Sequence, residues 1–169
     1  KQLLSERAQA EMEMGVKMLE DLTPEQRKAA VAEYNAARKS SDDRIRDFLN
    51  SDTDYSTFKD WEETRGERMA LEMSRGLFSG NGEALTSDQE QKLISTMHRV
   101  NQQTGTSANL QKPENFDPQK FTPAEIEKQL ADYDTRAQQV AEQAAQFLSP
   151  KQVETLRTMQ QQWRSMTEG

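Results

Sequence analysis

The chain has 169 residues, of which 33% are hydrophobic and 30% are charged, so it is too polar for a protein with a thick core. Partial disorder fits this composition, and so do long thin helices that bury a narrow stripe; the periodicity described below favours helices. No apolar run is long enough to span a membrane. The net charge of −7 argues against a nucleic-acid partner, because an acidic surface repels phosphate. The absence of cysteine excludes disulfides, thiolate metal sites and cysteine nucleophiles.

The first segment, from about Leu3 to Asp21, is expected to be helical. Its apolar residues recur at helical spacing and form one stripe: Leu4, Ala8, Met12, Val16 and Leu19. A second helix is expected from residue 24 to about residue 49. It is either continuous or broken near residues 40–42, and we prefer one continuous helix. Residues 50–54 are expected to form a turn.

A third helix is expected from about Tyr55 to Phe78, followed by a loop at residues 79–82, which read Ser-Gly-Asn-Gly. The positions of this helix expected to face inward are Phe58, Trp61, Arg65, Met69, Met73 and Leu77. The next helix is expected from Ser87 to about Gln103. Residues 104–120 are polar and contain one glycine and two prolines, so we expect a flexible connector there.

The C-terminal part is expected to contain two more helices, one from Pro123 to Phe147 and one from Pro150 onward. The first has an unbroken apolar stripe, made of Ile126, Leu130, Tyr133, Ala137, Val140, Ala144 and Phe147. The second has Leu156, Met159, Trp163 and Met166 on one face. The short junction between them predicts antiparallel packing.

These elements predict an all-α fold of elongated antiparallel hairpins, or a bundle of about six helices, in a single helical domain over residues 1–169. Capped helix starts are expected at Thr23, Thr86, Thr122 and Ser149. At each one, the hydroxyl accepts from the backbone N–H three residues on, and the Gln or Glu there bonds back to the N–H of the cap. Because thin hairpins bury little surface alone, we also expect a homodimer.

Three of the capped starts share the pattern Leu-Thr/Ser-x-x-Gln, and their leucines at positions 22, 85 and 148 are separated by 63 residues each time. The residues 8, 12 and 15 positions after each leucine lie on one helix face. They are Ala30, Tyr34 and Ala37; Leu93, Met97 and Val100; and Leu156, Gln160 and Trp163. This spacing indicates a weak internal repeat of residues 1–84, 85–147 and 148–169. The alternative is that any amphipathic helix shows such spacing.

The chain offers little for catalysis or metal binding. His98 is the only histidine, and neither a second histidine nor a carboxylate stands four residues away. Residues 52–54 resemble the start of a calcium loop, but the glycine and the closing glutamate of such a loop are missing. We therefore expect no metal, no cofactor and no catalytic residue. An enzyme would require carboxylates such as Asp54 and Glu62 to converge in a pocket.

Methionine and tryptophan supply the candidate partner-binding residues. Methionine side chains adapt to irregular partners, and an exposed tryptophan can anchor an interface. The candidates are Met12, Met14, Met18, Trp61, Met69 and Met73. The alternative is that these side chains fill the seams between the chain's own helices.

The repeated motif resembles that of the LTxxQ-motif proteins of the bacterial periplasm, which include the Spy and CpxP type stress proteins. The matching residues are Leu22, Thr23 and Gln26; Leu85, Thr86 and Gln89; and, more loosely, Leu148, Ser149 and Gln152. The resemblance implies an elongated helical hairpin fold, a dimer with a concave face and a periplasmic location. It also implies ATP-independent holding of unfolded envelope proteins, or signalling to an envelope stress system.

The resulting hypothesis is a non-enzymatic, helical protein-binding module of the bacterial cell envelope, acting as a holdase or stress adaptor on protein clients. The alternative is an extracytoplasmic sensory or regulatory domain that binds one specific protein. In both hypotheses the sequence leaves open a leader or membrane anchor upstream of Lys1.

Overall fold

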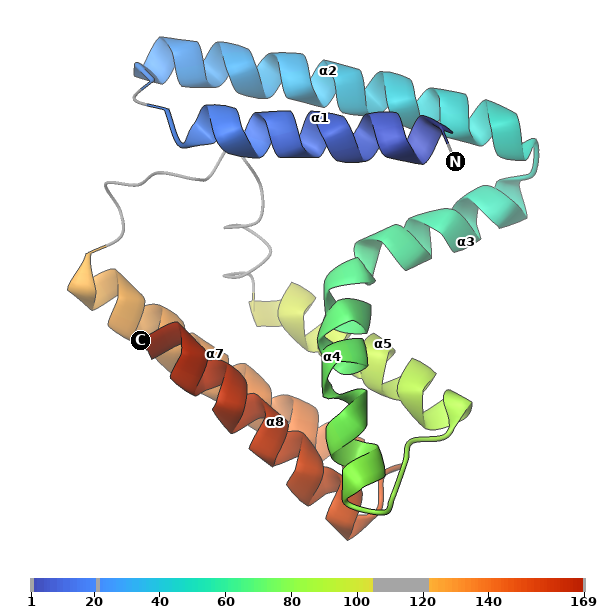
Figure 1. Cartoon of the computed structure of the whole chain (residues 1–169), viewed down its shortest axis with the longest axis vertical. Coiled ribbons are helices and arrows are strands. Elements are labelled where there is room, and N and C mark those ends of the chain that lie inside the picture. The colour runs from blue at the N-terminus through green and yellow to red at the C-terminus, as the bar shows by residue number, and fades with distance from the viewer. Residues whose placement is uncertain (1, 21, 105–121, 169) are drawn as a thin grey trace. The chain divides into compact units, whose positions relative to one another are not determined.

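The computed structural model describes residues 2–20, 22–104 and 122–168, with side chains as far as residue 165. The described residues form seven helices and no strand, which confirms the predicted all-α fold of about six helices (Figure 1). By its contacts the chain divides into two compact units, one up to Glu62 and one from Glu63 onward. Two units of this kind can still belong to one domain, so the predicted single domain stays a prediction. The expected connector at residues 104–120 lies, apart from Thr104, outside the described residues.

Unit 1 is a helical hairpin with a third helix after it. Helices α1 (Gln2–Met18) and α2 (Pro24–Leu49) run antiparallel and pack along their length (Figure 1). The preferred interpretation of one continuous helix over residues 24–49 is confirmed. Asn50 ends α2 in the left-handed conformation, with φ of 48°. The turn is shorter than predicted, because the Ser51 hydroxyl accepts from the Asp54 backbone N–H and α3 (Asp52–Glu63) begins at once.

The core of unit 1 is small. Met14 and Met18 of α1 are buried against Ala30 of α2, and this cluster is extended by the partly buried side chains of Leu22, Val31 and Tyr34. Ile45 is a further buried apolar residue of α2. Phe48, three residues further on, is 77% exposed. The packed side of α2 therefore extends as far as Ile45 and does not include Phe48.

Unit 2 contains the four remaining helices, α4 (Arg65–Gly80), α5 (Ser87–Thr104), α7 (Pro123–Ala144) and α8 (Pro150–Glu168). Helices α4 and α5 form one hairpin and α7 and α8 form a second. The two hairpins also meet through α5 with α7 and through α4 with α8. Its core is one cluster: Leu71, Phe78, Leu93, Ile94, Met97, Val100, Val140, Ala141, Ala144, Leu148, Val153, Leu156 and Met159.

Three predictions about residues 55–82 are wrong. The expected single helix is divided at Thr64, where Thr64 and Gly66 have low helix propensity. The side of α4 that packs carries Leu71, Ser74 and Phe78, whereas Met69 and Met73 face solvent. The predicted loop is also shorter, since α4 continues to Gly80. Of the positions predicted to face inward, Phe58 and Leu77 are partly buried, and the exposed ones are Trp61, Arg65, Met69 and Met73.

All four predicted helix caps are present. Thr23, Thr86 and Ser149 each form a complete capping box with the glutamine three residues on, at donor–acceptor distances of 2.9–3.2 Å. At Thr122 the hydroxyl accepts from the Glu125 backbone N–H at 3.2 Å. The three Leu-Thr/Ser-x-x-Gln motifs stand at equivalent places, each in the turn that joins the two helices of a hairpin.

Candidate protein-binding surface

A row of apolar side chains on α1 faces solvent. Leu4, Met12, Val16 and Leu19 are 47%, 67%, 59% and 78% exposed, and Ala8 is exposed between the first two. At 3.6 residues per turn, the four positions within α1 share about a third of the circumference of the helix, and Leu19 lies in the turn directly after Met18. The five residues are the stripe that the sequence pattern predicts, and we call them the α1 stripe.

The stripe is exposed because α1 has a second face, and that second face packs. Arg7, Met14 and Met18 point toward the rest of unit 1 and are 4–6% exposed. A helix that is apolar on two sides can bury only one of them against a single partner helix. Large exposed apolar faces are uncommon on monomeric proteins and mark interaction sites. The α1 stripe is therefore the strongest candidate surface in unit 1.

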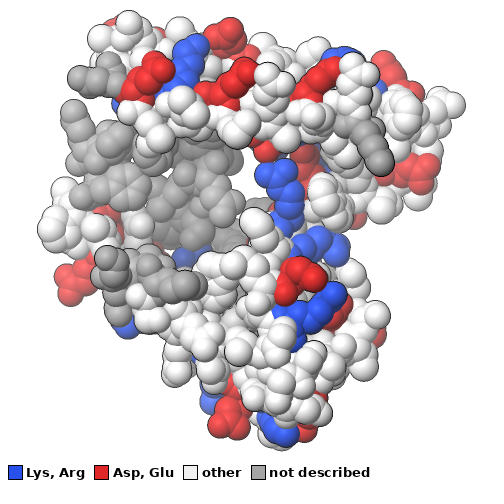
Figure 2. Space-filling view, viewed as in Figure 1, with Lys and Arg blue, Asp and Glu red and all other residues white. Residues whose placement is uncertain are grey.

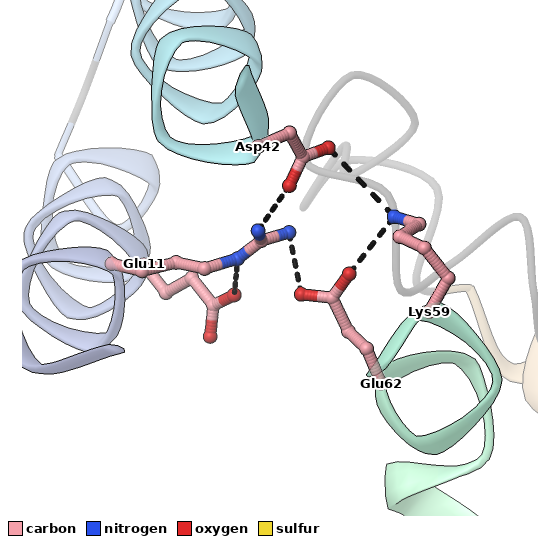
Figure 3. A network of polar contacts seen from close by, with 5 residues as sticks. Glu11, Asp42, Lys59 and Glu62 are labelled. Carbon is pink, nitrogen blue, oxygen red and sulfur yellow. Dashed lines mark hydrogen bonds and ion pairs between the residues drawn. The ribbon is translucent and has the colours of Figure 1, made fainter. Parts of the chain in front are cut away.

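A partly buried ionic network around Arg7 lies on the packed side of α1 (Figure 3). The Arg7 guanidinium donates to the Asp42 carboxylate of α2 and lies 2.5 Å from Glu62 Oε1 of α3, while its Nε lies 3.8 Å from Glu11 Oε1. Lys59 of α3 completes the network, with its Nζ 2.9 Å from Glu62 Oε2 and 3.7 Å from Asp42 Oδ2. Helix α3 has no buried side chain of its own, and this network joins it to the hairpin together with the exposed Arg46–Asp52 ion pair.

The charges in the network hold both cations in their protonated forms. Burial alone would lower the pKa of Arg7, but the hydrogen bond to Asp42 and the charges of Glu62, Asp42 and Glu11 outweigh burial and raise it. The same balance raises the pKa of Lys59 above its ordinary value, through Glu62 and Asp42. The network is thus a set of ion pairs in which Arg7 and Lys59 stay charged near neutral pH.

The sequence analysis missed this network, although the sequence contains a signal for it. Arg7 lies one heptad before Met14, on the face of α1 that is otherwise apolar. A charged residue on a packing face indicates a buried partner of opposite charge. The identity of that partner depends on how α2 and α3 lie against α1, which sequence spacing does not determine.

The capping motifs form a second buried polar site, which lies inside unit 2. Gln89 Nε2 donates to Gln152 Oε1 at 3.0 Å, and Gln152 Nε2 donates back to Gln89 Oε1 at 3.2 Å. The two amides also reach the backbone carbonyls of Phe147, Glu83 and Ala84. This pair joins the turns of the two hairpins across 63 residues of sequence. The glutamines of the second and third motifs therefore have a structural role beyond capping their own helices.

The predicted partner-binding residues divide into two groups. Met14 and Met18 fill the core between α1 and α2, as in the alternative interpretation of the methionines, and they are not accessible to a partner. Met12 lies on the α1 stripe. Trp61 of α3, at 47% exposed, is accessible, and so are Met69 and Met73, at 60% and 67% on one side of α4. That these four residues bind a partner remains a prediction.

In the part of the chain that the structure describes, no three His, Asp or Glu side chains converge as metal ligands. His98 Nδ1 lies 3.6 Å from Glu67 Oε1, and its Nε2 lies 3.4 Å from the Gln102 amide. Glu67 also accepts from Asn101, so this carboxylate has a structural role between α4 and α5. Among the described helices, none combines the length and the apolarity that crossing a bilayer requires.

Acidic and basic side chains are interspersed over the helices on the face drawn in Figure 2. A binding surface for nucleic acid would show basic side chains gathered on one face or along one helix. No family model, curated protein or solved structure matches the chain. The candidate function therefore has to be argued from the α1 stripe itself.

Proposed function

We propose that the chain is a non-enzymatic protein-binding module that holds apolar segments of other proteins on the α1 stripe. The observation that supports this proposal is a set of four large apolar side chains, between 47% and 78% exposed, of which three lie on one side of α1 and Leu19 lies directly after the helix. Each loses contact with water when a partner covers it, which gains roughly 1 kcal/mol per half-exposed side chain.

The chemistry of the stripe favours a protein partner. Met12 stands at its centre, and the flexible, polarisable methionine side chain adapts to apolar partners of different shape. Glu13 and Glu20 follow stripe residues directly in sequence, and the chain carries a net charge of −7. This charge disfavours anionic lipid surfaces and nucleic acid, because both repel carboxylates.

The resemblance of the capping motif to LTxxQ-motif proteins supports placing this module in the bacterial cell envelope, as an ATP-independent holdase or stress adaptor. A sensory or regulatory domain with one specific partner is the second candidate. The narrowness of the stripe favours it, since one helix face fits one amphipathic helix of a partner.

Reduced insulin is a suitable client for a test, because the cysteine-free chain is itself unaffected by the reductant. The wild-type chain should suppress light scattering by the aggregating insulin B chain at stoichiometric amounts. The double variant Met12→Glu/Val16→Glu should lose most of this suppression. Ala36→Glu is the matched control, because it adds a carboxylate at an exposed position of α2 away from the stripe.

Circular dichroism should show that all three proteins are equally helical. If the wild-type chain leaves aggregation unchanged, or if the double variant suppresses it as well as wild type does, holding of clients on the stripe is refuted. Retention of a single protein from an envelope extract by wild type, and its loss in the double variant, would select the one-partner alternative.

A further inference from the structure

Helix α4 ends in a Schellman motif whose geometry favours glycine. The backbone N–H of Gly82 donates to Ser79 O at 3.0 Å, and the N–H of the next residue, Glu83, donates to Phe78 O at 3.2 Å. Gly82 has a φ of 79°, in the left-handed region that glycine adopts without steric cost. The residue before it is Asn81, so the end of α4 contains the one Asn-Gly pair of the sequence.

An Asn-Gly pair can react with itself, without a cofactor or a second protein. The backbone nitrogen of Gly82 attacks Cγ of the Asn81 side chain. A bond forms between that nitrogen and Cγ, the Cγ–Nδ2 bond breaks, and ammonia leaves with the proton that the attacking nitrogen gives up. Water then opens the cyclic imide and gives either aspartate or isoaspartate. Glycine hinders the attack least, because it has no side chain beside its nitrogen.

We infer that Asn81 is a deamidation site that the folded turn keeps slow, and that its conversion to isoaspartate loosens the joint between the two hairpins of unit 2. Asn81 is exposed and lies in the turn between α4 and α5, where water has access. Helix ends open locally at a lower cost in free energy than the unfolding of a whole unit. The reaction therefore proceeds during these local openings.

In the closed turn, both reacting groups are engaged in other bonds. Asn81 Nδ2 donates to Thr155 Oγ1 of α8 at 2.8 Å, and the N–H of Gly82 is used in its bond to Ser79. Ring closure also requires Cβ of Asn81 and the nitrogen of Gly82 to be nearly eclipsed about the Cα–C bond, and a ψ of 2° keeps them apart. Thr155 is buried and its own hydroxyl donates to Lys151 O at 3.0 Å, so its position is fixed. The bond to Thr155 therefore slows the reaction by holding the amide.

Isoaspartate in place of Asn81 would disrupt the turn, because it adds one carbon to the main chain. The residues that follow connect the turn to the joint between the hairpins. The carbonyls of Glu83 and Ala84 accept from Gln152 Nε2 at 3.4 Å and 3.3 Å. The carboxylate of Glu83 also accepts from the Ser149 hydroxyl. The modification therefore reaches the capped start of α8 and the glutamine pair beside it.

The second product, aspartate, should have a smaller effect than isoaspartate. It keeps the length of the main chain, but it cannot donate to Thr155, and its charge lies at the C-terminus of α4, where the helix dipole is also negative. Lys151 offsets part of this charge, since its Nζ lies 3.8 Å from the place that a Cβ on Gly82 would occupy. The encoded variant Asn81→Asp thus separates the effect of the charge from that of the altered main chain.

Peptide mapping by mass spectrometry, after incubation of the full chain in mildly alkaline buffer, measures deamidation at each asparagine. Asn50 is the control site within the chain, because it is also exposed at the end of a helix but is followed by Ser51. Asn81 should deamidate several-fold faster than Asn50. A rate at Asn81 no higher than that at Asn50 would overturn the assignment of the site.

The protection by Thr155 is tested with Thr155→Val, which should raise the rate at Asn81 roughly fivefold, because the loss of one net hydrogen bond raises the opened fraction. Thr158→Val is the matched control, since the hydroxyl of the exposed Thr158 bonds only within α8 in the described contacts. Equal rates in the two variants would overturn the protection. In concentrated urea the turn is absent, so both variants and the wild-type chain should deamidate at one common rate. A faster rate for Thr155→Val in urea would also overturn the protection.

The consequence is tested on the isoaspartate form, separated by ion exchange and identified by labelling with an isoaspartate methyltransferase. In a Trp61→Phe background, Trp163 reports unfolding of unit 2, because it packs against the core of that unit. The isoaspartate form should unfold at a lower urea concentration than the fresh chain, with Asn81→Asp between the two. Unfolding at the urea concentration of the fresh chain would overturn the loosening of the joint. These measurements involve no client, so their outcome is independent of the proposed function.

Discussion

The three hairpins use one capping motif in two different settings. In unit 2 the glutamines of the second and third motifs are directed at each other and tie two hairpins together, and Gln152 is 5% exposed. In unit 1 the first motif forms the same capping box, but Gln26 is exposed and the α1–α2 hairpin has no second hairpin within its unit. The motif therefore specifies where a helix begins, and other residues decide whether a hairpin acquires a partner.

Those other residues lie on the second helix of each hairpin. Eight positions after the motif leucine, unit 2 has the fully buried Leu93 and Leu156, whereas unit 1 has the small Ala30. Eleven positions after it, unit 2 has a buried Thr96 and Met159, and unit 1 has Glu33. A glutamate at this place would be costly to bury, so α2 does not support a second layer. The two hairpins of unit 2 pack against each other, whereas the α1 stripe of unit 1 stays exposed to solvent.

The two tryptophans allow the units to be followed separately, because Trp61 lies in unit 1 and Trp163 lies in unit 2. The largest expected effect is that of Leu156→Ala, which leaves a cavity in the core of unit 2. We expect a loss of about 3–4 kcal/mol in the free energy of unfolding reported by Trp163 in a Trp61→Phe background. Leu19→Ala, at a position 78% exposed, is the control and should change stability by less than about 0.5 kcal/mol. Comparable losses for the two variants would contradict the described difference in burial.

The next largest effect is expected in unit 1, from Arg7→Met. Removing the guanidinium leaves Asp42 and Glu62 without their main cation, which should cost about 2–3 kcal/mol, as measured by urea unfolding with Trp61 as the reporter. Arg46→Met is the control, because the Arg46–Asp52 pair is exposed and its loss should have no measurable effect. If Arg7→Met unfolds at the wild-type urea concentration, the network does not hold α3 to the hairpin.

A smaller effect should distinguish the motif glutamines. Gln152→Leu removes half of the reciprocal amide pair and leaves polar groups unsatisfied inside unit 2, which should cost about 2 kcal/mol. Gln26→Leu removes only the exposed half of a capping box and should cost less than about 1 kcal/mol. Thermal unfolding followed through Trp163 and Trp61 measures both. Equal losses would mean that the motif acts only as a cap, and that the pairing in unit 2 adds nothing.

The sequence was sufficient for the features that depend on neighbours along the chain. The four caps, the continuity of α2 and the all-α fold follow from local hydrogen bonding and helical periodicity, and all are confirmed. Periodicity identified the apolar rows on α1 and α4 but not which row packs. Each helix has two candidate faces, and the choice depends on the partner helix, as Leu71 and Phe78 show against Met69 and Met73. The Arg7 network was missed for the same reason.

The smallest expected effect is a difference in alkaline stability between the units. Burial, followed by the charge of Glu11, raises the pKa of Tyr34 above 10.0, and the pKa of Lys59 is raised above 10.5 by the carboxylates around it. A raised pKa in the folded state means that each group stabilises unit 1 below its unfolded pKa, and that this contribution is lost as the pH rises through the folded value.

In unit 2 burial also raises the pKa of Tyr133, whereas in unit 1 the raised pKa of Lys59 adds to the effect of Tyr34. Unit 1 should therefore lose stability before unit 2 between about pH 9 and pH 11, as read from urea unfolding with Trp61 and Trp163 as separate reporters. Tyr34→Phe should reduce the alkaline loss in unit 1 and leave that of unit 2 unchanged. An unaltered pH profile in Tyr34→Phe would assign the loss to Lys59, and earlier loss in unit 2 would reverse the predicted order.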